Sequence, residues 1–438
     1  MNLPMPQTAV ETLSVSGDSH SGEEKETLAW EIREKLAEIH GTPAYLYEAR
    51  IPALRARELK GVFPEALPSR LLYSFKANPL PSLAAVLREA GCEADLTSPG
   101  EVLAAKEAGY DLSRALYGGP GKSAEEYLSA LDAGISHFSV ESSLDLERLS
   151  EASGQLRKRA KVLLRVNPLS PPRAKLAMSG VASQFGFEEE ELRREGGKLL
   201  SRVGDGVSIV GMHLYWGTQI GDSESLLSSF ETTVALAEEL SDRVGFPLEI
   251  LNLGGGFAWP YAHSGTGPDL MPLKEGLSSL LERSDAAKSA EWWFESGRYL
   301  AASSGTLVAR VMEVKASKEG RLFLILDTGI HHLGGMAGLG RIPRFSIDLL
   351  VPQERRANEV LEMDVVGQLC TPLDCIGKKL PIPRVEPGDL VAIPNVGAYG
   401  ATASVVNFLS RKAPVEIVHR SGEVVAVHRL RTGHETLS

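Results

Sequence analysis

The sequence predicts an α/β fold in two parts, an N-terminal (β/α)₈ barrel of the TIM type followed by a C-terminal β-rich domain. Two observations predict the barrel. The chain has 438 residues, too many for one simple core, and short strand-like runs alternate with helical stretches over residues 71–294. A third observation predicts the β-rich domain: strand-like runs after about residue 300 are separated by Gly/Pro turns, with few helical stretches. On pattern alone, a doubly wound open sheet is the competing arrangement for the first part.

Eight short apolar or β-branched runs supply the predicted barrel strands. In chain order they are Leu71–Phe75, Ala94–Thr97, Ala115–Tyr117, His137–Val140, Val162–Val166, Ile209–Tyr215, Glu249–Leu253 and Trp292–Phe294. The stretches with helical spacing between them include Ser82–Ala90, Glu101–Ala108, Ala124–Ala133 and Ser223–Leu240. Eight strands that alternate with helices are what a closed parallel barrel requires.

The β-rich domain is predicted from four later runs, Leu307–Val314, Leu322–Asp327, Asp389–Pro394 and Val415–His419. A further strand-like run, Thr42–Tyr47, lies before the barrel, and we assign it to the β domain. The predicted divisions are a disordered leader at 1–26, rich in Ser, Thr, Glu and Gly, and a segment at 27–50 that joins the β domain. The barrel itself is predicted at 51–300 and the β domain at 301–438.

Composition and charge exclude several classes of protein. The net charge is −11 and no basic tract or stripe occurs, which argues against a nucleic-acid partner. No apolar run approaches the ~18 residues of a membrane span, and the N-terminus lacks a signal pattern, so no membrane association is expected. The three cysteines, Cys92, Cys370 and Cys375, favour the cytoplasm with reduced thiols. We expect Cys92 and Cys375 to be buried and inert.

Histidines are the candidate metal ligands of this chain. His213, His331 and His332 are the ones that stand near strand ends. Adjacent histidines on a strand point to opposite faces, however, so His331 and His332 would rarely share one ion. The sequence therefore predicts no metal.

Lys76 is the most informative residue. It ends the apolar run Leu71–Phe75 and is followed by Ala-Asn-Pro, which neither continues a strand nor begins a helix cleanly. An ammonium group at the end of a buried strand is costly unless it is paired or neutralised. A Schiff base with an aldehyde would neutralise it, and a paired structural lysine is the alternative.

Two other strand ends carry compatible chemistry. Gly254, Gly255 and Gly256 follow an apolar strand, so their backbone N–H groups could approach an anion closely, although a tight turn without a ligand is equally possible. Glu295 and Arg298 follow the run Trp292–Phe294 and could alone be a surface ion pair. Pyridoxal phosphate explains all of these groups together. Lys76 would hold the aldehyde, Arg298 and the glycines the phosphate, and Glu295 the ring nitrogen, which a carboxylate keeps protonated.

In these motifs the chain resembles the fold-type III pyridoxal-phosphate decarboxylases, which include the diaminopimelate, ornithine and arginine decarboxylases. The resemblance runs from about Thr42 to about His419. Its landmarks are Tyr73–Asn78, Ala94–Glu101, Arg165–Pro168, Ser183–Gly186, Gly211–Gln219, Leu253–Phe257, Glu295–Tyr299, Asp327–Gly329, Gly367–Asp374 and Gly397–Gly400. It implies a homodimer with shared active sites at the interface.

The resemblance also implies roles for residues that the strand pattern does not single out. Cofactor contacts are implied for Arg165, Tyr215, Thr218 and Tyr399, with Tyr399 helping to hold the phosphate. Cys370 would reach the site of the other subunit as a catalytic residue. Substrate contacts are implied for Asp327, Thr371 and Asp374.

Three departures from the family pattern bear on the substrate. Tyr215 stands where the family usually has a histidine that stacks on the cofactor, and its ring can still stack. Thr371 stands where ornithine and diaminopimelate enzymes carry a carboxylate for the distal amine, with which a neutral hydroxyl cannot pair. The stretch 330–335, Ile-His-His-Leu-Gly-Gly, replaces the arginine-containing segment that grips the second carboxylate of diaminopimelate.

The pattern Cys-Thr-Pro-Leu-Asp at 370–374 and the run 397–404 look closer to a subgroup. That subgroup includes the glutamyl-carrier-protein decarboxylase of aminoglycoside biosynthesis and exosortase-associated decarboxylases. The expected activity is therefore α-decarboxylation of an amino acid or amino-acyl conjugate, with carrier-protein presentation as one option. The alternatives are a free diamino-acid decarboxylase, an amino-acid racemase, in which arginine typically takes the place of Glu295, and a catalytically silent regulator.

Overall fold

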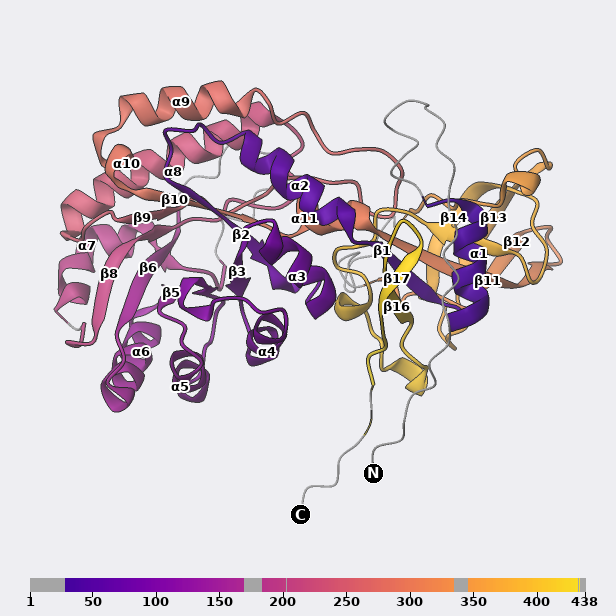
Figure 1. Cartoon of the computed structure of the whole chain (residues 1–438), viewed down its shortest axis with the longest axis horizontal. Helices are drawn as coiled ribbons and strands as arrows, with labels where there is room; N and C mark the ends of the chain where they lie inside the picture. Colours follow the sequence, from indigo (N-terminus) through magenta and orange to yellow (C-terminus); the bar gives the residue numbers. More distant parts are fainter. Residues whose placement is uncertain (1–27, 169–182, 202, 335–345, 432, 434–438) are drawn as a thin grey trace, which may run out of the picture.

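The fold was analysed in a computed structural model that describes residues 28–168, 183–201, 203–334, 346–431 and 433. A parallel barrel and a separate mixed β-sheet domain lie side by side, at the left and right of Figure 1. The predicted leader at 1–26 falls outside the described residues. Among the described helices none is long and apolar enough to cross a membrane.

The barrel closes through eight parallel strands of the described chain. They are β2 (Ser69–Ser74), β3 (Glu93–Leu96), β4 (Leu116–Tyr117), β5 (His137–Val140), β6 (Ala160–Asn167), β8 (Val207–His213), β9 (Ile250–Asn252) and β10 (Glu291–Ser296). Pairing runs β5-β4-β3-β2-β10-β9-β8-β6, and β5 also pairs with β6, which closes the ring. The closed ring confirms the predicted barrel and excludes the open sheet. A short strand, β7 (Phe187–Glu188), extends the sheet beside β6.

Helices surround the barrel and bury its outer face (Figure 1). They are α2 (Arg50–Gly61), α3 (Pro81–Glu89), α4 (Pro99–Glu107), α5 (Ala124–Asp132), α6 (Ser143–Leu156), α7 (Glu189–Leu200), α8 (Ser223–Val244), α9 (Leu273–Arg283) and α10 (Asp285–Ser289). Strand alternation explains the two apolar layers. Leu71 and Tyr73 of β2 belong to the cluster under the helices, whereas Leu72 belongs to a second cluster with Leu116, Leu163, Val210, Ile250 and Trp293. This second cluster fills the barrel interior.

The second sheet is built from strands at both ends of the chain. They are β1 (Ala44–Glu48), β11 (Gly305–Ala316), β12 (Leu322–Leu326), β13 (Val360–Val366), β14 (Cys375–Pro383), β15 (Leu390–Ile393), β16 (Val415–Arg420) and β17 (Glu423–His428). β1 pairs antiparallel with β11 and parallel with β16, and α1 (Trp30–His40) leads into it. A short helix, α11 (Arg298–Ala301), connects the barrel to β11.

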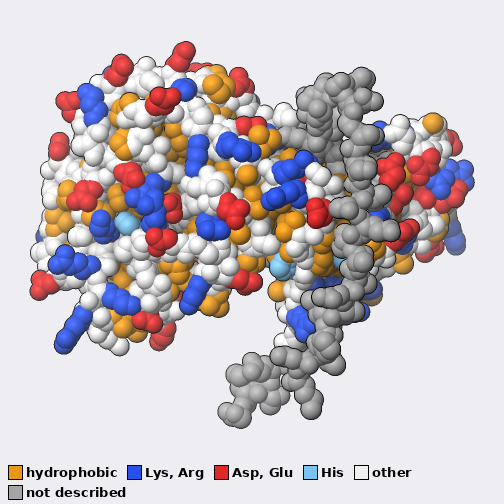
Figure 2. Space-filling model, viewed as in Figure 1, with side chains coloured by type: hydrophobic (Ala, Val, Ile, Leu, Met, Phe, Trp, Pro, Cys, Tyr) orange, Lys and Arg blue, Asp and Glu red, His pale blue; other side chains and the backbone are white. Residues whose placement is uncertain are grey.

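Charged side chains of both signs are interspersed over the barrel face seen in Figure 2. Many are neutralised locally: Arg70 and Glu291 form an ion pair at 2.7 Å, and Arg193 pairs with Glu239 at 2.7 Å. Acidic side chains therefore interrupt the basic ones on this face.

Candidate active site

A cavity lies at the carboxyl ends of the barrel strands, where parallel barrels carry their chemistry. Its walls bring together segments that are far apart in the sequence. They comprise Ser74, Lys76, Tyr215, Thr218, Gly255, Gly256, Phe257, Glu295, Ser296, Gly297, Arg298 and Tyr399. Eight of the residues singled out from the sequence are thus gathered in one place, namely Lys76, Tyr215, Thr218, Gly255, Gly256, Glu295, Arg298 and Tyr399.

Lys76 sits in a single 3₁₀ turn, Phe75–Ala77, directly after β2. The turn projects the side chain into the cavity, where 44% of it is exposed, and Nζ lies 3.3 Å from Oδ2 of Asp95 on β3. Burial would lower the pKa of Lys76, but the carboxylates of Asp95 and Glu295 outweigh it and raise the pKa above its ordinary value. The ammonium is therefore paired, while it remains accessible from the cavity.

Glu295 at the end of β10 is buried and held in a fixed orientation. Its Oε1 accepts a hydrogen bond of 2.8 Å from Nδ2 of Asn252, the last residue of β9. Nε2 of His213 lies 3.4 Å from the same oxygen without hydrogen-bond geometry, and Nδ1 of His213 is 2.8 Å from Oγ of Ser139. Burial, followed by the nearby charge of Arg165, lowers the pKa of His213 well below its ordinary value, so this ring is neutral.

The glycine loop passes so close to neighbouring backbone that side chains are excluded. A Cβ on Gly255 would lie 2.2 Å from the carbonyl oxygen of Glu295, and Gly254 and Gly256 have φ of +65° and +103°, which favours glycine. The Gly254 N–H donates to Oδ1 of Asn252 at 2.8 Å, and its carbonyl accepts from Glu295 N–H at 2.7 Å. The turn is thereby locked to β10.

Arg298 and Ser296 provide unused donors beside this loop. Both are buried, and Nε of Arg298 and Oγ of Ser296 have no hydrogen-bond partner in the described structure. The guanidinium lies 4.8 Å from the ring centroid of Tyr399 and 5.5 Å from that of Tyr261. Burial lowers the pKa of Arg298. Buried donors without acceptors are costly, and a phosphate in this cradle would satisfy them. The residues therefore fit pyridoxal phosphate, with an amine for its aldehyde and a carboxylate for its ring nitrogen.

Tyr399 comes to the barrel from the β domain. Its N–H donates to the carbonyl of Ala77 at 2.6 Å, next to Lys76, and it adopts a left-handed backbone with φ of +55°. Nδ2 of Asn78 donates to the carbonyl of Gly397 at 2.9 Å. These two bonds join the Lys76 turn and the residue after it to the second domain, so the site depends on how the domains pack.

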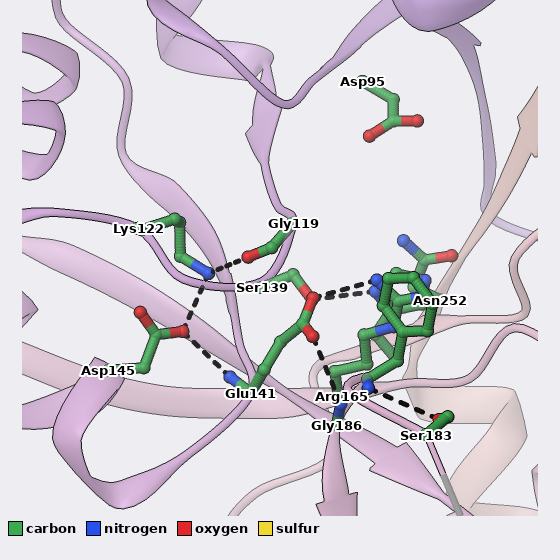
Figure 3. A network of polar contacts seen from close by, with 12 residues as sticks. Asp95, Gly119, Lys122, Ser139, Glu141, Asp145, Arg165, Ser183, Gly186 and Asn252 are labelled. Carbon is green, nitrogen blue, oxygen red and sulfur yellow. Dashed lines mark hydrogen bonds and ion pairs between the residues drawn. The ribbon is translucent and has the colours of Figure 1, made fainter.

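Arg165 belongs to a neighbouring polar network rather than to the cavity wall (Figure 3). Its Nη1 donates to Oε1 of Glu141 at 2.9 Å, and its guanidinium lies 4.8 Å from the ring centroid of Phe185. Deeper in the network, Nζ of Lys122 pairs with Oδ2 of Asp145 at 2.7 Å, and both side chains are buried. Glu141 N–H donates to that same Asp145 oxygen at 3.0 Å, which links the two ion pairs.

Cys370, Thr371 and Asp374 lie in the loop 367–374 between β13 and β14. Cys370 is exposed, and in the described part of this single chain it does not line the cavity at Lys76. Asp374 is buried: Oδ1 accepts from Ile330 N–H at 2.9 Å and Oδ2 from Leu369 N–H at 2.7 Å. Asp327, after β12, accepts from Arg310 N–H at 2.8 Å and also stands away from the cavity.

The histidine pair differs from the sequence expectation. His331 and His332 lie in a turn rather than in a strand, and their ring centroids are 3.7 Å apart, so they do not point to opposite faces. Nε2 of His332 lies 3.0 Å from the carbonyl of Lys412, and Nδ1 lies 3.3 Å from Oγ1 of Thr328. Burial lowers the pKa of His331 to about 4 and that of His332 to about 3. No group of three His, Cys, Asp or Glu side chains among the described residues could hold a metal ion. Of the two thiols expected to be buried, Cys92 is buried and Cys375 only half-buried.

Sequence reasoning missed Asp95 and Asn252, and it considered His213 only as a metal ligand. Asp95 contacts Lys76, and Asn252 and His213 contact Glu295. All three occupy strand positions whose side chains enter the barrel mouth. Period-two alternation along β3, β8 and β9 could have indicated their direction, but not which strand would become the neighbour of which.

The comparisons with known proteins agree with this chemistry. Residues 53–302, more than half of the chain, match the family described as pyridoxal-dependent decarboxylase, pyridoxal binding domain. The L-glutamyl-[BtrI acyl-carrier protein] decarboxylase of Niallia circulans is 33% identical over 409 residues, covering 91% of this chain and 93% of its own. The diaminopimelate decarboxylase of Aquifex aeolicus is 32% identical over 394 residues, covering 89% and 90%.

Solved structures show the same two-domain arrangement. The diaminopimelate decarboxylase of Helicobacter pylori, complexed with L-lysine, superposes with a TM-score of 0.78 at 26% identity, over 91% of this chain and 95% of that one. The lysine anchor, the glycine cradle and the buried carboxylate thus occur on the fold that the relatives share. This chain belongs to the pyridoxal-dependent decarboxylases and is a pyridoxal-phosphate-dependent decarboxylase of an amino acid or amino-acyl conjugate.

Proposed function

We propose that the substrate is an amino-acyl group carried on an acyl-carrier protein rather than a free diamino acid. The single observation that supports it most is the chemistry of the loop 367–374. Thr371 is neutral, and its Oγ1 accepts from Leu373 N–H at 3.3 Å. The carboxylate of Asp374 already accepts two backbone N–H groups, one on each oxygen. The loop therefore offers no uncommitted carboxylate for a distal ammonium group. The Niallia circulans relative, whose printed substrate is a carrier-bound glutamyl group, supports the same assignment.

We propose the following roles in the barrel. Lys76 binds the cofactor aldehyde, and Asp95 holds its Nζ in place beforehand. Arg298, Ser296 and the N–H groups of Gly255 and Gly256 hold the phosphate. When bound, pyridoxal phosphate withdraws the electron pair that is left on Cα as the carboxylate departs as CO₂. Glu295 holds a proton on the ring nitrogen, and Asn252 fixes its orientation.

The remaining proposed contacts surround this core. Tyr215 presents a ring face to the cofactor, with Thr218 beside it in the same wall, and Tyr399 closes the phosphate end. Arg165 acts through its ion pair with Glu141, which fixes the end of β6. Asp374 and Asp327 act on the substrate indirectly, through the backbone that they hold: Asp374 accepts from Ile330 N–H and Asp327 from Arg310 N–H.

We propose that the active enzyme is a homodimer in which Cys370 reaches the partner's site and returns a proton to Cα. The thiol is exposed in the single chain, where a partner subunit could be reached. A thiol is a suitable proton donor for general acid catalysis. The three free thiols suit a reducing compartment, so we propose the cytoplasm as its location.

Carbon dioxide release across a substrate panel tests the substrate proposal. The panel contains free ornithine, lysine, diaminopimelate and glutamate. It also contains glutamate joined as a thioester to the phosphopantetheine of an acyl-carrier protein. We expect turnover of the carrier-bound substrate and little release from the free diamino acids. The variant Thr371→Asp should improve relative activity on ornithine, whereas the uncharged isostere Thr371→Val should not. Faster turnover of a free diamino acid by the wild-type enzyme would contradict the proposal.

A further inference from the structure

A second cavity, of about 570 Å³, lies at the junction of the two domains. Its walls come from α1, β1 and β16 on one side, and from α2 and the segment after the glycine loop on the other. They include Arg33, Glu48, Arg55, Trp259, Ser303 and Arg356. None of its lining residues lines the cavity at Lys76. Its volume falls within the range of small-molecule sites, roughly 300–1,000 Å³.

Arg33 is the residue in this wall that requires explanation. It is 4% exposed, and its Nε has no hydrogen-bond partner in the described structure. Its guanidinium lies 5.3 Å from the ring centroid of Trp30, which supplies no carboxylate. Burial, with a smaller contribution from the charge of Arg356, lowers the pKa of Arg33 to about 10. A charge held in this way is costly unless an anion compensates it.

The acidic groups near this cavity are already committed to other partners. Glu48 pairs with Nε of Arg50 at 3.0 Å and accepts from Ser421 N–H at 2.8 Å. Both oxygens of Glu58 accept from Nη1 of Arg55, at 3.0 and 2.8 Å. No ion pair joins Arg33 or Arg356 to an acidic side chain of the described residues. The wall therefore carries an excess of positive charge.

We propose that this junction cavity is a second binding site, for a small molecule that carries a phosphate or carboxylate group. Arg33 and Arg356 would supply the charge, and the hydroxyl-bearing residues Ser303, Thr266 and Thr306 line the remaining wall. Phosphate and carboxylate share the acceptor geometry that a guanidinium recognises.

The position of the cavity connects it to both halves of the catalytic site. Trp259 follows the glycine loop by three residues, and Asn395 precedes Tyr399 by four. Nε1 of Trp259 donates to Oδ1 of Asn395 at 3.1 Å, so this wall already bridges the domains. An anion bound here contacts α1 of the β domain and the barrel together, and stabilises their packing.

Thermal unfolding of the full-length holoenzyme, desalted so that its own phosphate site is filled but no free pyridoxal phosphate remains to compete, tests this proposal. Inorganic phosphate and succinate are titrated separately. We expect at least one of them to raise Tm in a saturable way, and the one that acts identifies the preferred group. Arg33→Met and Arg356→Met should each weaken the apparent Kd about tenfold or more. Arg194→Met, at an exposed arginine of α7, should bind as the wild type does.

The anion-free state gives an independent readout. Arg33→Met removes an uncompensated buried charge and keeps the apolar stem, so its Tm without anion should equal or exceed that of the wild type. Arg356 is exposed, so the Arg356→Met protein should fold normally even if the Arg33→Met protein does not. The proposal is overturned if neither anion shifts the wild-type Tm, or if both variants retain the wild-type Kd.

Discussion

At the residue scale, the active site is defined by one cation between two carboxylates. Lys76 lies 3.3 Å from Asp95, and the charges of Asp95 and Glu295 together raise its pKa. Without cofactor the amine is therefore held protonated, which stabilises the empty site and opposes covalent attachment. In our proposal, the negatively charged phosphate of the cofactor binds near Arg298 and provides the compensating attraction.

Replacing Lys76 with Ala should abolish covalent attachment of the cofactor. After borohydride reduction, mass spectrometry should show the added mass of pyridoxal phosphate on the wild type and none on Lys76→Ala. The exposed helix α4 provides the matched control, Lys106→Ala, which should be labelled as the wild type is. Labelling of the Lys76→Ala protein at full yield would rule out this lysine.

Replacing Glu295 with Gln keeps the shape and the hydrogen bond from Asn252 but removes the charge that holds a proton on the ring nitrogen. We expect cofactor binding to persist while kcat falls by about 10²-fold or more, because electrostatic stabilisation of the transition state is lost. Glu291→Gln is the control, since Glu291 lies on the same strand but pairs with Arg70 outside the cavity. Near-normal kcat in Glu295→Gln would place the ring nitrogen elsewhere.

At the element scale, the loop 367–374 is organised from within by one buried carboxylate. Asp374 accepts N–H groups from its own loop and from the turn 329–334, so it fixes the distance between the Cys370 segment and the histidine pair. Gly329 and Gly367 approach so closely that a Cβ at either would lie within 2.3 Å of an Asp374 oxygen. The loop shape therefore depends on this residue together with two glycines.

Asp374→Ala should leave two backbone N–H groups without acceptors and destabilise the protein by about 2–4 kcal/mol. Asp374→Asn keeps one acceptor oxygen, so its free energy of unfolding should fall by about half as much. Thermal unfolding measures both, and steady-state kinetics should show a fall in kcat, because Cys370 is no longer positioned. Equal Tm for the wild type, Asp374→Ala and Asp374→Asn would show that the carboxylate does not hold the loop.

At the scale of the whole molecule, the site is assembled across domains and, in our proposal, across subunits. Mixing Lys76→Ala with Cys370→Ala dimers tests the second point. Each heterodimer would contain one site with both residues intact, so activity should return to about one quarter of wild type when subunits exchange randomly. Control mixtures of each variant with itself should stay inactive. Failure to recover activity, with exchange verified by tagged subunits, would contradict a shared site.

Buried histidines should make the whole fold sensitive to acid. Burial lowers the pKa of His137 and His331 to about 4 and that of His332 to about 3. Below the unfolded pKa of ~6.5, the unfolded chain binds protons that the folded chain does not, so stability is full above pH ~6.5 and falls toward pH 4. Each histidine contributes about 1.4 kcal/mol per pH unit in that window.

Urea midpoints at pH 7, 6 and 5 measure this effect. We expect the urea midpoint to fall progressively as the pH is lowered. His137→Phe preserves the edge contact with Trp293, and its midpoint should fall less over the same pH range. Identical wild-type midpoints at pH 7 and pH 5 would contradict the assignment of neutral buried rings.

The sequence by itself determined the class of fold, the eight barrel strands and the chemistry of the main site residues. These follow from local signals: alternation within a strand, helical spacing between strands, and a lysine, a glycine triplet and a carboxylate at strand ends. Parallel strands place their carboxyl ends at one edge, so Lys76 and Glu295 could be predicted to meet once the barrel was inferred.

Only the tertiary structure decided which groups touch. β1 enters the second sheet between β11 and β16, and β16 lies more than 360 residues later in the sequence. Asp95 pairs with Lys76, Asn252 orients Glu295, and the rings of His331 and His332 come into contact because of a turn that periodicity does not reveal. Arg33 becomes an uncompensated buried charge only when α1 packs at the domain junction. The physical reason is common to all five cases: pairing energy and desolvation depend on neighbours brought together by folding, and such neighbours leave no periodic trace in the chain.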